Sequence, residues 1–427
     1  MNKIIISNGH SKFHLSVAAV EIDKSNMLSK FITAAYPHPF ISDLIIKNNF
    51  FKGSKLMRLA NRSEKINYNL ISSLWISELF FQIGILLKKI INIKFLSENL
   101  IVFSMGLYGY QSRKILKKVE AGIYHYRSGY GGSSLKIAKS KDMILLADHS
   151  IANPQILEDL VGNLGKFRPN FFMGKISLFW RHILTDLRKA DYILVNSDFV
   201  KKTFTSFTST FNTNNIHVIY CGVDDQFLNY IPRKKFKLKK NNINNIKIIF
   251  AGNFEKRKGA EILIAAIKKL KTPGKEWTFE IIGGIDPELK ENHSNFFSLK
   301  NLRCSGLVSR NELAHKMFNA DIFVFPSLAE GSARVIFEAM ACGCFIITTP
   351  NSGSIVKDDI NGLVVETGNI NQLKEALKKS ILLSSAKRQK IGKLNYDLIR
   401  REYTQFHYGK NLKKLYSLLL KQKRDIL

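Results

Sequence analysis

One segment carries most of the information about the architecture: Phe325-Pro326-Ser327-Leu328-Ala329-Glu330-Gly331-Ser332-Ala333-Arg334-Val335-Ile336-Phe337-Glu338-Ala339-Met340-Ala341-Cys342-Gly343. The apolar run that ends at Pro326 predicts a buried strand, and the small residues after it predict a turn. A helix is expected to begin near Ala333 and to end at Gly343, since glycine commonly follows the last turn of a helix. The turn therefore belongs at the carboxyl edge of a sheet, where open α/β folds bind ligands.

Strands and helices alternate on both sides of this segment, which indicates parallel sheets covered by helices on both faces. In the second half we expect strands at residues 246–251, 278–282, 302–305, 322–325, 345–348 and 362–365, with helices at 260–270, 311–319, 334–341 and 372–382. In the first half we expect strands at 4–6, 31–33, 123–126, 143–146, 192–195 and 217–220.

The pattern lapses between Asp224 and Lys247, where asparagines and a basic cluster from Arg233 to Lys240 indicate a linker or an exposed flap. The sequence thus predicts an α/β protein of two doubly wound, Rossmann-like domains, residues 1–225 and 226–404, that face each other across a cleft. We expect a last helix at about 405–427 to pack back on the first domain.

Bulk properties limit the function classes. The 427 residues exceed what one core usually organises, and 45% hydrophobic content allows two cores. The formal net charge of +31 favours polyanionic partners: nucleic acid, anionic phospholipid or phosphorylated substrates. We see no signal-peptide pattern, and Glu78, Lys88 and Lys89 interrupt the most apolar stretch, so we expect a cytoplasmic protein without a transmembrane helix. Cys342 and Cys344 lack zinc-ligand spacing and are interpreted as core residues.

Glu330 and Glu338 are the candidate ligand-binding acids. Glu338 lies more than a turn inside the predicted helix, so a ligand that reaches both must extend along the helix N-terminus, as a nucleotide-sugar does. Carboxylates accept hydrogen bonds from paired hydroxyls, which suits Glu338 to a ribose and Glu330 to the donor sugar. Gly331 and Ser332 lack bulk, so N–H groups at the helix start can approach a diphosphate. In the plainer alternative, Glu330 is a charge favoured by the dipole at a helix start and Glu338 is an ordinary solvated helix residue. The apolar neighbours of Glu338, however, predict that it is buried and needs a partner.

This pattern resembles the retaining glycosyltransferases of family 4, which have the GT-B fold and carry two glutamates separated by seven residues. The resemblance rests on Glu330-Gly331 through Glu338-Ala339-Met340-Ala341-Cys342-Gly343, on residues 320–327, and on Lys258-Gly259, Leu263-Ile264, Gly306, Asn361-Gly362-Leu363 and Gly222-Val223-Asp224. It covers residues 191–382 well and the N-terminal half only in outline. It implies sugar transfer from a UDP- or GDP-sugar to a glycan or lipid-linked saccharide, in the biosynthesis of capsule, lipopolysaccharide or other surface polysaccharide.

The resemblance implies a donor site formed by Gly252, Asn253, Arg257, Lys258, Gly283, Val308, Glu330, Gly331, Ser332, Ala333, Arg334, Val335 and Glu338. Arg257 and Lys258 would place positive charge against the donor diphosphate and offset the charge on the leaving group. Many members of the family have an arginine where this chain has Asn253, and Arg257 is the candidate replacement. A solvated basic turn is the alternative interpretation of these cations.

Turnover is expected to need neither a metal nor an organic cofactor. Lysine and arginine can stabilise a leaving diphosphate without a metal ion. No Asp-x-Asp pair follows a predicted strand of the second domain, and Asp358-Asp359 lies in a polar turn.

The N-terminal half offers candidates for the acceptor side of the cleft. Gly9 and His14 border the loop after the first strand, where the family has a Gly-rich loop. The turn that contains Gly131 and Gly132 is expected to expose backbone N–H groups. The resemblance gives His149 a catalytic contact to the donor sugar or the acceptor, whereas a structural hydrogen-bonding histidine is the alternative.

The insertion between Lys47 and Phe103 and the segment 167–172 combine aromatic, aliphatic and cationic residues, which suits docking on the anionic inner face of the plasma membrane. Packing of extra helices explains the aliphatic residues equally. Two rival functions remain at this point: a sugar-nucleotide epimerase with the same fold, and a nucleic-acid-binding protein. The second accounts for the charge but not for the two glutamates, and no recognised binding motif is present, so we expect no nucleic-acid partner.

Overall fold

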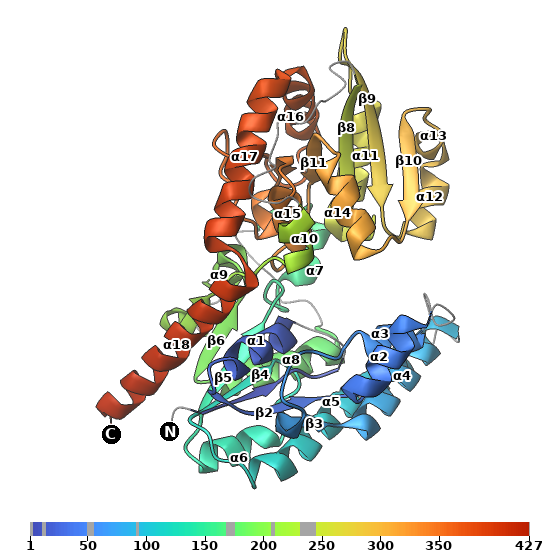
Figure 1. The fold of residues 1–427 in the computed structure, drawn as a ribbon. Coiled ribbons are helices and arrows are strands. Elements are labelled where there is room, and N and C mark those ends of the chain that lie inside the picture. Colours follow the sequence, from blue (N-terminus) through green and yellow to red (C-terminus); the bar gives the residue numbers. More distant parts are fainter. Residues whose placement is uncertain are drawn as a thin grey trace.

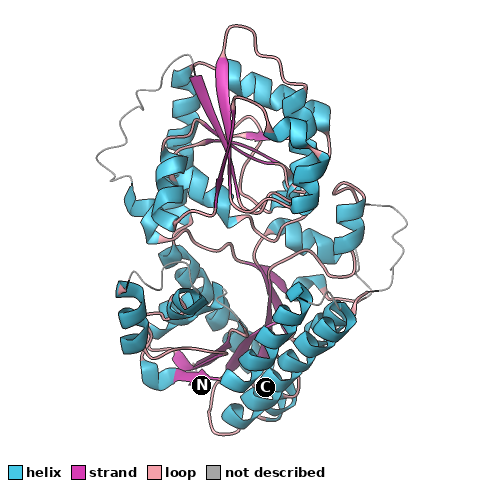
Figure 2. Ribbon diagram, turned by 90° about the vertical axis from the view of Figure 1, so that its right-hand side faces the viewer, coloured by secondary structure: helices cyan, strands magenta, loops and turns pink. Residues whose placement is uncertain are grey.

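The computed structural model describes residues 3–10, 14–48, 55–90, 94–167, 176–205, 210–230 and 245–426. Two parallel sheets form two lobes, each with helices on both faces of its sheet (Figures 1 and 2). The predicted basic cluster at 233–240 and the aromatic residues at 50–52 and 168–172 lie outside the described residues.

The first lobe contains a seven-stranded sheet in the order β3-β2-β1-β4-β5-β6-β7. Its strands are β1 (Ile4–Ser7), β2 (Leu28–Thr33), β3 (Ile71–Ser73), β4 (Ile123–Arg127), β5 (Ile144–His149), β6 (Tyr192–Val195) and β7 (Ile216–Val218). Its helices are α1 (His14–Asp23), α2 (Pro39–Lys47), α3 (Lys55–Ala60), α4 (Trp75–Ile90), α5 (Lys94–Leu116), α6 (Ser134–Ser140), α7 (Leu157–Gly162), α8 (Leu178–Lys189) and α9 (Asp198–Thr205). All six predicted strands are present, and β3 is an additional one.

The second lobe contains a six-stranded sheet in the order β10-β9-β8-β11-β12-β13. Its strands are β8 (Asn245–Ala251), β9 (Glu276–Ile282), β10 (Leu302–Gly306), β11 (Ile322–Phe325), β12 (Phe345–Thr348) and β13 (Leu363–Val364). Its helices are α10 (Asp225–Tyr230), α11 (Ala260–Lys268), α12 (Pro287–Asn292), α13 (Ser294–Phe297), α14 (Arg310–Phe318), α15 (Arg334–Ala341), α16 (Ile370–Leu382) and α17 (Ser385–Glu402). The strand order reverses between the neighbours β8 and β11, which is where doubly wound sheets open a ligand crevice.

Burial explains why the central strands of the second lobe are continuously apolar. All four residues of β11 and the first three residues of β12 are buried side chains of Ile, Phe or Val, as expected for parallel strands covered on both faces. Cys342 and Cys344 are also fully buried in this core, which confirms their interpretation as packing residues.

The chain crosses between the lobes twice, and the two crossings lie side by side. Val223 pairs with Thr404, and the Val223 N–H donates to the carbonyl of Tyr403 at 2.9 Å. After the second crossing, α18 (Gln405–Ile426) returns to the first lobe and packs against α1, where Leu412 and Tyr416 are buried. None of the described helices combines the length and apolar character that a membrane crossing requires.

Candidate functional site

A cavity of about 430 Å³ opens at the carboxyl edge of the second sheet, among the turns that follow β8, β9, β10 and β11. Eleven of the thirteen predicted donor-site residues line it: Gly252, Asn253, Lys258, Gly283, Val308, Glu330, Ser332, Ala333, Arg334, Val335 and Glu338. Arg257 and Gly331 are not among the described residues that form its wall. The turns after these four strands therefore bring most of the predicted donor-site residues together around one cavity.

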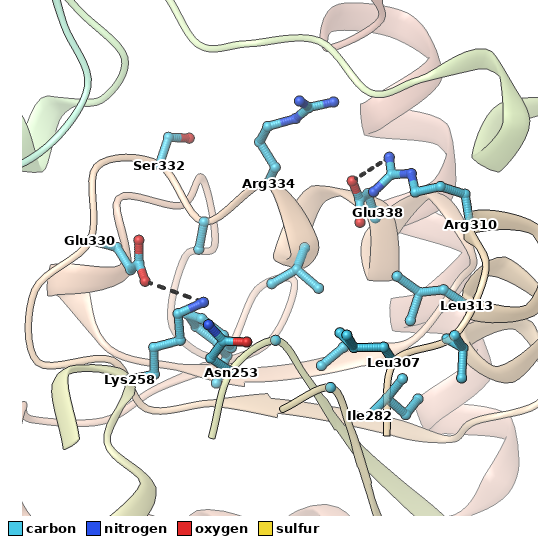
Figure 3. A pocket seen from close by; sticks show the side chains of 17 residues that line it. Asn253, Lys258, Ile282, Leu307, Arg310, Leu313, Glu330, Ser332, Arg334 and Glu338 are labelled. Carbon is cyan, nitrogen blue, oxygen red and sulfur yellow. Dashed lines mark hydrogen bonds and ion pairs between the residues drawn. The ribbon is translucent and has the colours of Figure 1, made fainter. Parts of the chain in front are cut away.

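Each glutamate in this cavity has a cationic partner. The Glu338 carboxylate lies 2.9 Å from Arg310 Nη2, and the Glu330 carboxylate lies 3.9 Å from Lys258 Nζ. Figure 3 shows the two pairs at opposite ends of the cavity, with the start of α15 between them. A ligand that meets both carboxylates must therefore be extended.

The helix that carries Glu338 begins and ends close to the predicted positions. Its N-cap is Ala333, which has no side-chain oxygen, so no side chain at that position caps the N–H groups of the first turn. Gly343 follows the helix with a φ of +74°, the left-handed conformation in which glycine terminates helices. An anionic ligand at the start of α15 would meet both the helix dipole and these N–H groups.

Glu338 is buried, as the apolar pattern predicted, with 3% of its surface exposed. Burial raises the pKa of Glu338, although Arg310 and Arg334 oppose that shift. No sequence motif pointed to Arg310, which is the first residue of α14 and one of the lining residues. Its position four residues after the glycine that ends β10 is the signal that could have identified it, because that turn lies at the same sheet edge.

Arg257 has partners outside the cavity wall. Its Nη1 lies 2.7 Å from the Glu330 carboxylate and donates to the carbonyl of Ala329 at 3.0 Å, while its Nη2 pairs with Glu255 at 3.0 Å. These three acceptors hold the guanidinium outside the cavity wall. In this structure Arg257 thus contacts Glu330, Ala329 and Glu255, and its part in diphosphate binding stays a prediction.

Gly331 also acts differently from the prediction. A Cβ atom at this position would lie 1.8 Å from the carbonyl oxygen of Ser150 in the first lobe. The Ser197 hydroxyl, from the start of α9, donates to the Gly331 carbonyl. Glycine is thus needed here for close approach of the two lobes.

His149 ends β5 on the side of the first lobe that meets this contact, next to Ser150. Its Nδ1 is 2.9 Å from the Ser128 hydroxyl, and its ring is buried. Burial lowers the pKa of His149 to about 3, so the imidazole is neutral at physiological pH. The contact of His149 to the donor sugar or the acceptor stays a prediction.

The other acceptor-side candidates have structural partners. His14 Nε2 lies 2.8 Å from the buried Asp148 carboxylate. The Gly9 N–H donates to the Tyr108 hydroxyl at 3.1 Å, and a Cβ there would lie 2.7 Å from the Tyr130 ring. Both residues therefore have partners within the first lobe, and their acceptor-side roles stay predictions.

The expectation of exposed N–H groups at the glycine turn was wrong. The N–H groups of Gly131 and Gly132 donate to the two oxygens of the buried Asp186 carboxylate, at 2.7 and 3.1 Å. Asp186 belongs to α8, more than fifty residues further along the chain, so the local sequence gave no sign of it.

Two further observations concern metals. Across the described ranges, no three or more histidine, cysteine, aspartate and glutamate side chains gather as a potential metal site. The Asp358 carboxylate accepts the Val364 N–H at 2.8 Å, and the Asp359 carboxylate pairs with Lys379 at 2.5 Å.

Known proteins resemble this chain in sequence and fold. Residues 232–397 match the family "Glycosyl transferases group 1". An uncharacterised glycosyltransferase of Methanocaldococcus jannaschii is 35% identical over 173 residues, 39% of this chain and 44% of the relative. A Campylobacter jejuni relative is 28% identical over 197 residues, 44% of this chain and 50% of the relative; its name is N-acetylgalactosamine-N,N'-diacetylbacillosaminyl-diphospho-undecaprenol 4-alpha-N-acetylgalactosaminyltransferase.

The chain spans about half the length of these two relatives. Other relatives include glycosyltransferases of amylovoran and capsular polysaccharide biosynthesis. A crystal structure of a glycosyltransferase from Rickettsia africae superposes with a TM-score of 0.64 at 18% identity, over 99% of this chain and 100% of that one. The protein therefore has the GT-B fold and carries a Glycosyl transferases group 1 domain over residues 232–397.

Proposed function

We propose that the protein is a retaining glycosyltransferase that moves a sugar from a UDP- or GDP-sugar to a glycan or lipid-linked saccharide acceptor. The observation that carries this proposal is that two ion pairs, Glu338 with Arg310 and Glu330 with Lys258, lie at opposite ends of the same cavity. A nucleotide-sugar presents ribose hydroxyls, a diphosphate and sugar hydroxyls in the same linear order. The relatives in polysaccharide and lipid-linked saccharide biosynthesis support the acceptor class.

Three charged lining residues then have chemical tasks. Glu338 accepts hydrogen bonds from the ribose hydroxyls, and Glu330 accepts them from the sugar. Lys258 balances the negative charge that grows on the diphosphate as the bond to the sugar breaks. Gly252, with a φ of +128°, leaves space for this lysine, because a Cβ there would lie 3.0 Å from Lys258 Nζ. The retaining outcome rests on the resemblance at the two glutamates.

Calorimetry against UDP-, GDP- and CMP-sugars tests the proposal, followed by product analysis with and without a lipid-linked saccharide. We expect binding of one nucleotide class, and a product that contains the sugar in its original anomeric configuration only when acceptor is present. An isomerised sugar formed from donor alone would establish the epimerase instead. Absence of binding to every nucleotide-sugar would exclude both enzymes.

Chelation is expected to leave the reaction unchanged, because the ammonium of Lys258 neutralises the leaving group without a metal ion. Initial rates should be equal in about 5 mM EDTA, a usual chelating excess, and in buffer with added manganese. Loss of activity in EDTA that manganese restores would contradict both the metal independence and the role given to Lys258. The proposed reaction needs the nucleotide-sugar donor and the acceptor, and no organic cofactor.

The first lobe presents an unusual apolar surface. Of the 23 exposed large hydrophobic residues in the described part of the chain, fifteen lie between residues 40 and 110. Four of them, Ile76, Leu79, Ile83 and Leu86, recur at helical spacing and form one exposed apolar stripe along α4. Together with the net charge of +31, this stripe supports our proposal that the protein binds the surface of an anionic membrane, where a lipid-linked acceptor resides.

Replacing Ile76 and Leu79 together with serine is expected to lower binding to anionic vesicles about tenfold, because two large apolar side chains no longer enter the lipid interface. Sedimentation with phosphatidylglycerol-rich vesicles measures the effect. Leu394→Ser and Leu418→Ser, exposed on α17 and α18, are the matched controls and should bind as the wild type does. Equal binding of the wild type to neutral and anionic vesicles would contradict the proposal.

A further inference from the structure

Four charged side chains connect the proposed donor cavity to the point where the chain crosses between the lobes. Asp224 belongs to the first crossing, directly after Val223, which pairs with the second crossing. Its carboxylate contacts the guanidinium of Arg310, and it lies 2.8 Å from Arg334 Nη2. Arg310 in turn contacts Glu338 at 2.9 Å. The cluster thus contains two acids and two cations.

The two arginines line the cavity, whereas Asp224 is not among its described lining residues. Arg310 and Arg334 are the first residues of α14 and α15, so the contacts of Asp224 tie two helix starts to the crossing. Further contacts restrain the arrangement. The Arg310 guanidinium lies 4.7 Å from the centroid of the Phe227 ring, and Gln405 donates to Asp224 at 2.7 Å. Asp224 acts on the cavity only through other residues.

The position of Arg310 matters because it is shared between two carboxylates. Burial opposes the charge on Asp224, but Arg334 and Arg310 outweigh that effect and hold the pKa of this carboxyl below its ordinary value. Without the charge at residue 224, Glu338 would be the only acid left in the cluster. The Arg310 guanidinium would then pair with Glu338 alone. The ribose hydroxyls of a donor need the same Glu338 oxygens, so the arginine and the donor would compete.

We propose that Asp224 is a positioning residue for the donor. Its ion pair with Arg310, made from the crossing between the lobes, limits the contact of Arg310 with Glu338, so that Glu338 oxygen atoms remain able to accept hydrogen bonds from the nucleotide ribose. This inference rests on the proposed function, since it takes the cavity as the nucleotide site. It gives an interdomain residue a role in donor affinity. A purely structural ion pair would affect only the stability of the crossing.

The test is Asp224→Asn, which keeps the shape of the side chain and its bond from Gln405 but removes the charge. We expect the affinity for UDP or GDP, whichever the wild type binds, to fall about tenfold by calorimetry, the scale of one charge-assisted hydrogen bond. The donor KM should rise by a similar factor, while kcat changes by less than about twofold. Asp225→Asn is the matched control, because it removes the same charge from the next, exposed residue, and its affinity should equal that of the wild type.

A double-mutant cycle identifies the route of the effect. If Asp224 acts through Arg310, then Asp224→Asn adds no further loss in an Arg310→Ala background. A full additional loss there, or an unchanged nucleotide affinity with a lowered melting temperature alone, would overturn the proposal and leave Asp224 a structural residue. Each loss of affinity is measured against the nucleotide affinity of the wild type. If the wild type binds no nucleotide, it is the proposed function that fails.

Discussion

Lys258→Ala is expected to lower kcat/KM about 100- to 1,000-fold, the range observed when one group that stabilises transition-state charge is removed from an enzyme. Lys258 is the cation that lies closest to Glu330 within the cavity wall, at 3.9 Å. It is positioned by the glycine at 252 and by the ring of Phe325, whose centroid is 5.8 Å from the ammonium. Because charge on the diphosphate increases as the sugar departs, the loss should appear mainly in kcat.

Lys256→Ala provides the comparison, since Lys256 belongs to the same turn but is exposed and absent from the cavity wall. Steady-state kinetics with saturating acceptor should show wild-type rates for this control. A Lys258→Ala variant that lost less than about fivefold in kcat while its donor KM rose would show that the lysine only binds the ground state. Either result can be read without knowledge of the acceptor linkage, because both variants are assayed on the same substrate pair.

Much of the second lobe could be predicted because its information is local. The apolar run that ends at Pro326, the small residues after it and the glycine at 343 each specify backbone conformation within a few positions. The structure confirms the strand, the turn and helix α15 in that order. Burial of Glu338 could be inferred for the same reason, since its apolar neighbours in the helix must face the core. The strand β3 was missed because its three residues are only half buried and carry little pattern.

Contacts with partners that lie far away in the sequence could not be predicted. The turn at Gly131 and Gly132 looked open, but its N–H groups are satisfied by Asp186, 55 and 54 residues away. Arg257 suited a phosphate contact by position, yet the fold brings Glu330 within 2.7 Å of it. In the same way His14 pairs with Asp148, 134 residues further along. Electrostatic pairing of this kind is decided by tertiary structure, so charged and polar residues were placed less reliably than apolar ones.

The buried carboxylate of Asp148 stabilises the first lobe. Asp148→Asn is therefore expected to lower the free energy of unfolding by about 3–5 kcal/mol at pH 7. Asp148 is 2% exposed and lies 2.8 Å from both Arg127 and His14, with His125 at 3.7 Å. The amide would remove the negative charge that Arg127, His14 and His125 surround in a largely buried position. Urea denaturation of both proteins measures the loss, and Asp359→Asn, which breaks an exposed pair with Lys379, should leave stability almost unchanged.

The pH dependence gives this prediction a second readout. Burial favours the neutral acid, but His14, His125 and Arg127 overcome it and hold the pKa of Asp148 well below its ordinary value. A depressed pKa means that the charged carboxylate stabilises the folded state above the unfolded pKa, about 3.9 for aspartate, and that this contribution is lost as pH falls further. The difference between wild type and Asp148→Asn should therefore be complete at pH 7 and shrink below about pH 4. A difference that stays constant from pH 7 to about pH 3 would mean that packing and not charge holds this cluster together.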